Sequence, residues 1–110
     1  MLNLRLYMLQ RLTALLMAPL GIGHLAVMIY AIQGGLSAAE ILSRTQGSVA
    51  WFMFYGVFVL AVSIHGAIGV RVVLHEWGGM KGALLDGATW LLGAGLLWLG
   101  ARAVWAVTFS

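Results

Sequence analysis

Residues 49–70 read VAWFMFYGVFVLAVSIHGAIGV, an apolar run in which His65 is the only side chain that titrates near neutral pH. A helix needs about 20 consecutive apolar residues to cross the hydrocarbon core of a bilayer. The run therefore predicts a transmembrane helix. An ionisable side chain so deep in a span is rare, and by default it indicates a functional site.

Two further runs, residues 12–32 and 82–101, have the same apolar character, and the last one can extend to residue 107. We expect all three runs to be helices, because lipid offers no partner for an unpaired backbone N–H or C=O group. The prediction is an all-α integral membrane protein. It has one domain, residues 1–110, whose three transmembrane helices pack in a bundle.

The composition excludes several classes of protein. Hydrophobic residues make up 63% of the 110 residues and charged residues 8%, and the mean hydropathy is +1.01. Soluble domains carry about 25% charged residues, so a soluble globular fold is excluded. The chain has no cysteine, which excludes disulfides, cysteine-ligated metal clusters and thiol catalysis. The net charge of +3 is small and scattered, so we expect no nucleic-acid partner. We also expect no cleavable signal peptide, because Pro19 and His24 interrupt the first run.

Polar and glycine-rich segments separate the runs. A Gly-Gly pair at residues 34–35 can end the first helix in the left-handed conformation. Residues 36–47 predict a short amphipathic helix, which Ser37 and Glu40 would begin as a capping box. Residues 75–81 are expected to form the second loop.

Proline and glycine predict local geometry within the spans. Pro19 lies in mid-span and frees the carbonyl of Leu15, so a kink is expected there. Four glycines should let the third helix approach a neighbouring helix closely: Gly87, Gly93, Gly95 and Gly100.

The basic residues predict the orientation in the membrane. Four belong to the N-terminal segment and the second loop: Arg5, Arg11, Arg71 and Lys81. Two belong to the opposite side: Arg44 and Arg102. This excess places the N-terminus and the second loop in the cytoplasm.

The second span carries the candidate chemistry. At about 100° per residue, His65, Gly69, Val72 and Glu76 share one face of the helix. Imidazole is the usual nitrogen ligand of haem iron, and a porphyrin edge needs space such as Gly66 and Gly69 would leave. The pattern therefore suggests haem ligation by His65.

The partners of this histidine can also be anticipated. Its second nitrogen could donate to the carbonyl of Ala61, which would fix the tautomer. Arg71 and Arg11 are candidates to bind haem propionates. The alternative is a histidine hydrogen-bonded to a neighbouring helix, with both arginines extending to lipid headgroups. From these residues alone, both interpretations stay open.

Two motifs resemble a known family. Residues 7–14, YMLQRLTA, and residues 65–71, HGAIGVR, with Glu76 and Trp77 after them, are similar to the membrane-anchor subunits of succinate dehydrogenase and fumarate reductase. The Arg-x-Thr-Ala opening and the later acid–aromatic pair resemble the smaller, D-type anchor. The C-type pattern often has histidine where this chain has Val72, which favours the D-type interpretation. The resemblance covers essentially the whole chain.

The resemblance implies a partner anchor, a haem b and a quinone. The haem would lie between two anchor subunits, with His65 as the axial ligand from this chain. Ubiquinone or menaquinone would bind near the cytoplasmic surface, beside Glu76, Trp77 and Arg11. The family usually has Asp-Tyr at the acid–aromatic pair, and tryptophan can donate one hydrogen bond but cannot accept one. The other implied partners are the iron–sulfur subunit, the flavoprotein subunit and lipid. The implied location is the bacterial inner membrane.

His24 lies at a depth similar to that of His65, if both are counted from the cytoplasmic side. It could be a second iron ligand, but no motif of the family places a ligand there. We expect it to be hydrogen-bonded within the bundle, with the second ligand supplied by another chain.

Two other functions stay open: a haem-free accessory subunit of another membrane complex, and a small transport component with His65 and Glu76 on a proton path. The chain has no flavin or dicarboxylate motif, so we expect no succinate oxidation by this subunit alone. The residues do not determine which quinone is used, whether succinate is oxidised or fumarate reduced, or whether the second anchor is different or identical.

Overall fold

The computed structural model describes residues 3–110, and most of them are helical. The helices are α1 (Leu4–Gly34), α2 (Ala38–Thr45), α3 (Val49–Glu76) and α4 (Gly82–Thr108). Three of these, α1, α3 and α4, are long and apolar enough to cross a membrane. No strand occurs in the described part of the chain. The predicted all-α membrane fold is confirmed.

Each spanning helix is longer than the apolar run that predicted it. At about 1.5 Å per residue, α1 is roughly 46 Å long, whereas the hydrocarbon core of a bilayer is about 30 Å thick. The starts of α1 and α3 are instead defined by polar caps, whereas no side chain caps the start of α4. Asn3 Oδ1 accepts a hydrogen bond from the backbone N–H of Leu6 at 2.9 Å, and Ser48 Oγ accepts one from Trp51 at 3.2 Å.

The connecting segments follow the prediction with one correction. Ser37 Oγ accepts a hydrogen bond from the N–H of Glu40 at 3.1 Å and begins α2, as expected. Gly35 ends α1 with a φ of 118°, a conformation that glycine adopts readily. The second loop is shorter than predicted, because α3 continues through Glu76 and only residues 77–81 connect it to α4.

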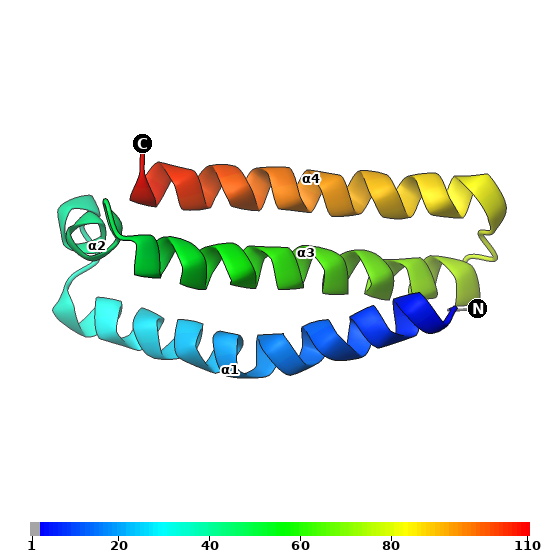
Figure 1. Ribbon diagram of the computed structural model, residues 1–110, viewed down its shortest axis with the longest axis horizontal. Coiled ribbons are helices and arrows are strands. Elements are labelled where there is room, and N and C mark those ends of the chain that lie inside the picture. The colour runs from blue at the N-terminus through cyan, green and yellow to red at the C-terminus, as the bar shows by residue number, and fades with distance from the viewer. Residues whose placement is uncertain (1–2) are drawn as a thin grey trace.

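The three long helices lie side by side, with α3 in the middle (Figure 1). α3 packs against both α1 and α4, which do not pack against each other. The start of α1 and the α3–α4 loop lie at one end of the molecule, and α2 and the C-terminus at the other. At that second end, the N–H of Gly47 donates to the carbonyl of Thr108 at 2.6 Å and joins the α2–α3 connection to the end of α4. α1 is bent near its middle, the part that contains Pro19, as predicted.

Close packing of α4 on α3 depends on two of the four glycines. A Cβ at Gly100 would collide with the side chain of Val59, and one at Gly93 would lie 3.3 Å from Cβ of Ala67. A Cβ at Gly87 or Gly95 would meet no heavy atom within 4 Å. For these two glycines, the predicted close approach to a neighbouring helix is wrong within this chain.

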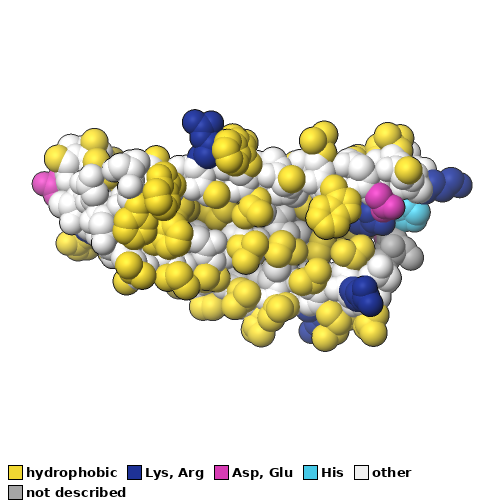
Figure 2. All heavy atoms as spheres, turned by 45° about the horizontal axis from the view of Figure 1, so that its top comes forward, with side chains coloured by type: hydrophobic (Ala, Val, Ile, Leu, Met, Phe, Trp, Pro, Cys, Tyr) yellow, Lys and Arg dark blue, Asp and Glu magenta, His cyan; other side chains and the backbone are white. Residues whose placement is uncertain are grey.

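The surface is largely apolar. Figure 2 shows hydrophobic side chains over much of one face, while many of the visible charged side chains gather toward one end. Leu15, Trp90 and Leu91 are 70%, 77% and 77% exposed. Exposed apolar surface on this scale marks a protein that is covered by lipid or by partner subunits.

Candidate functional site

The imidazole of His65 is directed at α1. Its Nδ1 lies 3.2 Å from Oγ1 of Thr13, a contact between residues 52 positions apart. Thr13 is buried, with 3% of its surface exposed, and His65 is half-buried. The predicted bond to the carbonyl of Ala61, one turn earlier on the same helix, is not formed. Thr13 of α1 is the hydrogen-bond partner of Nδ1 instead of Ala61.

The backbone of His65 is also held by α1. Nε2 of Gln10 donates a hydrogen bond to the carbonyl of His65 at 3.3 Å. Gln10 and Thr13 are three residues apart, so they lie on the same face of α1. One helix face therefore contacts both the ring and the main chain of the same histidine.

The glycines beside the histidine are bordered by other side chains of this chain. A Cβ at Gly69 would lie 3.7 Å from Nε2 of Gln10, and a Cβ at Gly66 would lie 3.6 Å from Cδ1 of Leu96. Both distances are ordinary van der Waals contacts, so neither glycine is required for the approach of α1 or α4 to α3. That these glycines leave space for a porphyrin edge stays a prediction.

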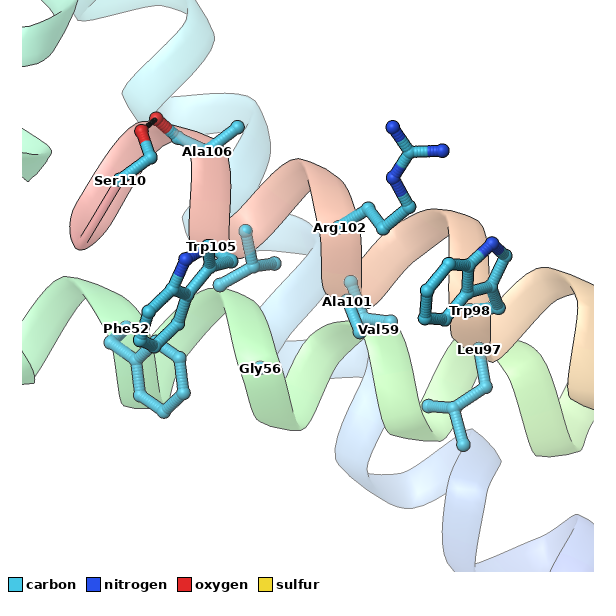
Figure 3. A pocket seen from close by; sticks show the side chains of 11 residues that line it. Phe52, Gly56, Val59, Leu97, Trp98, Ala101, Arg102, Trp105, Ala106 and Ser110 are labelled. Carbon is cyan, nitrogen blue, oxygen red and sulfur yellow. Dashed lines mark hydrogen bonds between the residues drawn. The ribbon is translucent and has the colours of Figure 1, made fainter.

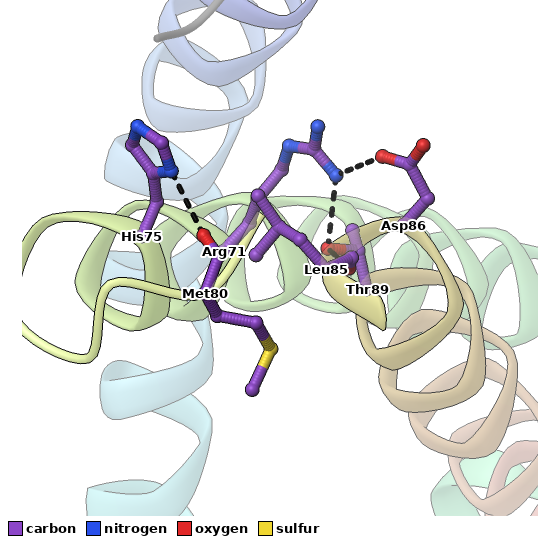
Figure 4. Close-up of polar contacts among 6 residues, drawn as sticks. All are labelled: Arg71, His75, Met80, Leu85, Asp86 and Thr89. Carbon is purple, nitrogen blue, oxygen red and sulfur yellow. Dashed lines mark hydrogen bonds and ion pairs between the residues drawn. The ribbon is translucent and has the colours of Figure 1, made fainter. Parts of the chain in front are cut away.

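Arg71 is directed at α4 (Figure 4). Its Nη1 lies 2.8 Å from Oδ1 of Asp86 and donates to Oγ1 of Thr89 at 3.3 Å. The side chain of Arg71 is 18% exposed and that of Asp86 is 60% exposed. Around α3, Arg71 is separated from His65 by about 120°. The structure does not bring this arginine to the histidine.

Arg11 points away from α3. Its Nη1 lies 3.3 Å from the hydroxyl of Tyr7, and its guanidinium lies 5.8 Å from the centre of that ring. It is two residues before Thr13, which turns it by about 160° from the side that contacts His65. Arg11 is exposed, so it can reach lipid headgroups or another subunit.

Glu76 and Trp77 lie at the end of α3 and are both exposed, Trp77 by 86%. Neither side chain forms a hydrogen bond or an ion pair with any residue from 3 to 110. Next to them, Nδ1 of His75 lies 2.9 Å from the carbonyl oxygen of Met80 and closes the loop (Figure 4). The acid–aromatic pair is thus available to molecules outside this chain.

His24 packs between aromatic rings of α3. Its ring centroid lies 6.1 Å from that of Tyr55, edge-on, and 5.2 Å from that of Phe58. It makes no hydrogen bond with any residue that the structure describes, so the expected bond within the bundle is wrong. His24 also lines an apolar groove of about 430 Å³.

Two larger grooves lie elsewhere on the bundle. One, of about 640 Å³, runs over α3 between α1 and α4 and has Arg71, Asp86 and Thr89 in its lining. The other, of about 620 Å³, lies between α3 and α4 (Figure 3). In it, Arg102 lies over the ring of Trp98 at 5.7 Å. His65 lines neither of these grooves.

Sequence reasoning missed four polar residues that contact the predicted site residues: Gln10, Thr13, Asp86 and Thr89. A signal for two of them was present. Gln10 and Thr13 lie at the boundary of an apolar run with helical spacing, and polar side chains at such positions often bond to a neighbouring helix.

Comparison with known families gives one result that covers almost the whole chain. Residues 2–107 match the family described as succinate dehydrogenase/fumarate reductase transmembrane subunit. Comparison with curated proteins and with solved structures gives no significant match. The matched region includes all three spanning helices and both motifs that carry the resemblance. This chain therefore belongs to the family of transmembrane subunits of succinate dehydrogenase and fumarate reductase.

Proposed function

We propose that this chain is a haem b-binding anchor subunit of a succinate:quinone oxidoreductase. It holds the iron–sulfur and flavoprotein subunits at the membrane, packs against a second anchor subunit and helps to form the quinone site. Membership of the family supports the role as an anchor. The observation that carries the haem proposal is His65, a half-buried histidine within a spanning helix whose Nδ1 contacts Thr13.

The residues of the chain fit one axial position of a haem. Imidazole is the usual nitrogen ligand of haem iron. Contact of Nδ1 with Thr13 leaves Nε2 of His65 for a metal, at a partly exposed part of the helix surface. Among residues 3–110, no three His, Cys, Asp or Glu side chains come together as a metal site. The second axial ligand would come from the partner anchor. When bound, a haem supplies one-electron transfer.

The two arginines are unequal candidates for the propionates. Arg71 already pairs with Asp86, and its guanidinium faces α4. Arg11 is exposed and contacts only an aromatic side chain of its own helix. The guanidinium of Arg11 can leave its weak contact with Tyr7 and form a charge-assisted hydrogen bond to a carboxylate. Neither guanidinium is directed at His65. Arg11 is the better candidate because Arg71 would have to give up its ion pair with Asp86.

The quinone site would use the exposed end of α3. Glu76 and Trp77 project there without partners in this chain, and a quinone carbonyl can accept from the indole N–H of Trp77. The basic residues Arg5 and Lys81 lie in the N-terminal segment and the α3–α4 loop, which share this end of the bundle. By the positive-inside rule we expect this end of the bundle, and the quinone site with it, to face the cytoplasm. The membrane would be a bacterial inner membrane.

The haem proposal is tested by His65→Ala in the intact complex. We expect loss of, or a large change in, the b-type haem spectrum, while the subunits still assemble. His75→Ala is the matched control, since it removes a histidine from the last turn of the same helix, outside the apolar run. A haem spectrum that is the same in His65→Ala as in His75→Ala contradicts the proposal.

The quinone proposal is tested by Glu76→Gln and Trp77→Leu. Both should lower quinone reduction more than electron transfer to a soluble dye, because only the former reaction uses the membrane site. Glu40→Gln, an exposed acid on α2 at the other end of the molecule, is the control. Equal losses in the quinone and dye assays would indicate faulty assembly and contradict the role of these residues.

A further inference from the structure

We infer that Thr13 selects the tautomer of His65: its hydroxyl oxygen accepts the Nδ1 proton, so that Nε2 carries the lone pair. Thr13 is thus a positioning residue for the histidine. The inference about the tautomer concerns only contacts within this chain. Its consequence for iron rests on the proposed haem function.

The direction of the Thr13–His65 hydrogen bond follows from the single proton of the threonine hydroxyl and from the distances around it. A threonine hydroxyl has one proton and can otherwise only accept. Oγ1 of Thr13 lies 2.8 Å from the carbonyl oxygen of Leu9 and 3.0 Å from that of Gln10. Both carbonyl oxygens lie closer to Oγ1 than Nδ1 of His65 does, so the hydroxyl proton is best placed on one of the carbonyls. Oγ1 of Thr13 then presents a lone pair to Nδ1 of His65, 3.2 Å away, and accepts a hydrogen bond from it.

The protonation of Nδ1 determines that of the other ring nitrogen, Nε2. A short contact between a lone pair and Nδ1 is favourable only if Nδ1 carries a proton. Neutral imidazole has one N–H, so Nε2 is then the unprotonated nitrogen, the form that a metal requires. If Nε2 carried the proton instead, the hydroxyl of Thr13 would have to turn its proton toward Nδ1 and give up its shorter contacts with the carbonyl oxygens of Leu9 and Gln10.

Burial strengthens the preference for this tautomer. Thr13 is 3% exposed, so water has little access to compete for its oxygen. The other nearby polar group of α1, Nε2 of Gln10, is engaged with the carbonyl of His65 at 3.3 Å. Of these two side chains, only that of Thr13 lies within hydrogen-bond distance of a ring nitrogen.

The consequence for a bound haem is a more basic ligand. A histidine that donates its second N–H to an oxygen is held in one orientation and gives more electron density to the metal. That density stabilises ferric over ferrous iron, so the contact should lower the midpoint potential of the haem. Loss of the hydroxyl should raise the potential and weaken haem retention.

The experiment uses the intact complex with Thr13→Val, which keeps the shape of the side chain and removes the hydroxyl. We expect the haem midpoint potential to shift to a more positive value and haem retention to fall by about tenfold or more. Thr13→Ser keeps the hydroxyl and should behave like the wild type. The measurements are a redox titration followed optically and the electron paramagnetic resonance spectrum of the low-spin ferric haem.

Two control variants separate the tautomer from packing. Thr108→Val removes another buried threonine, whose hydroxyl donates to the carbonyl of Val104 at 2.7 Å and not to a histidine. Gln10→Leu removes the other α1 contact to His65 without touching the ring. Neither control should shift the haem potential as Thr13→Val does.

Each outcome decides the inference. It is overturned if Thr13→Val leaves the potential unchanged, or if Gln10→Leu shifts it equally, since that would show a packing effect. If the Thr13→Val complex does not assemble, Thr13→Ala also removes the hydroxyl and takes its place. Its haem potential is compared with that of the wild type and of Gln10→Leu in the same way. Failure of the haem proposal is distinguishable, because it would appear as an unchanged spectrum in His65→Ala.

Discussion

The two sides of α3 are built differently. On the side of α1, Gln10 and Thr13 reach across to the main chain and ring of His65. On the side of α4, the contact through the apolar part of the span is made by small residues, with Gly93 against Ala67 and Gly100 against Val59. Lipid provides no hydrophobic force between helices, so association relies on close packing or on polar contacts. Of these two kinds of contact, the polar one reaches His65 from the α1 side only.

The difference suggests a division of roles between the two interfaces. The α4 interface has its one ion pair, Arg71 with Asp86, near the α3–α4 loop, where the helices leave the apolar core. Deeper in the span, it holds no histidine and serves to position α3. The α1 interface carries the polar contacts to the candidate iron ligand. Variants on the α4 side should therefore change stability, whereas variants on the α1 side should change the properties of a haem.

The largest effect on stability is expected from Gly100→Ala. Its new Cβ would collide with the side chain of Val59, and overpacking of this kind costs about 1–3 kcal/mol. Gly95→Ala is the matched control, because a Cβ there meets nothing within 4 Å and alanine favours the helix by about 0.5–1 kcal/mol. Thermal unfolding of the purified chain in mild detergent, followed by circular dichroism, measures both. Equal melting temperatures would show that α4 does not pack on α3 as described.

A smaller effect is expected from Asp86→Asn. The ion pair with Arg71 is partly exposed, with the aspartate side chain 60% accessible, and such pairs contribute about 0–1 kcal/mol. The loss should shrink as salt is added, because salt screens the charges. Glu40→Gln serves as the control, since Glu40 is an exposed acid that forms no ion pair with residues 3–110. A salt-independent loss as large as that of Gly100→Ala would show that the α4 interface depends on this pair rather than on small residues.

The smallest effect on the haem is expected from His24→Leu. The ring of His24 packs against Tyr55 and Phe58, and leucine can replace most of that apolar contact. The low-spin, six-coordinate spectrum should be retained, because the second axial ligand is proposed to come from the partner anchor. Absorption and electron paramagnetic resonance spectra of the complex check this. Conversion to a five-coordinate, high-spin haem would identify His24 as an axial ligand.

Much of the fold was predictable from local patterns. The three apolar runs each became a spanning helix, and Ser37 begins α2 as its spacing with Glu40 indicated. Helix ends were less predictable, because hydropathy marks the part of a helix that lies in hydrocarbon and not the part that continues into the headgroup layer. The extension of α3 to Glu76 is an example.

The sequence by itself determined that this chain crosses a membrane and that His65 lies within the second apolar run, residues 49–70, because the number of consecutive apolar residues is a local property. It also carried the motifs of the family to which the chain belongs. Only the tertiary structure decided the partners of the polar side chains: Thr13 rather than Ala61 for His65, and Asp86 for Arg71. The physical reason is that these contacts join different helices. Helical periodicity gives the face on which a side chain lies, but the register between two helices depends on how their whole surfaces pack.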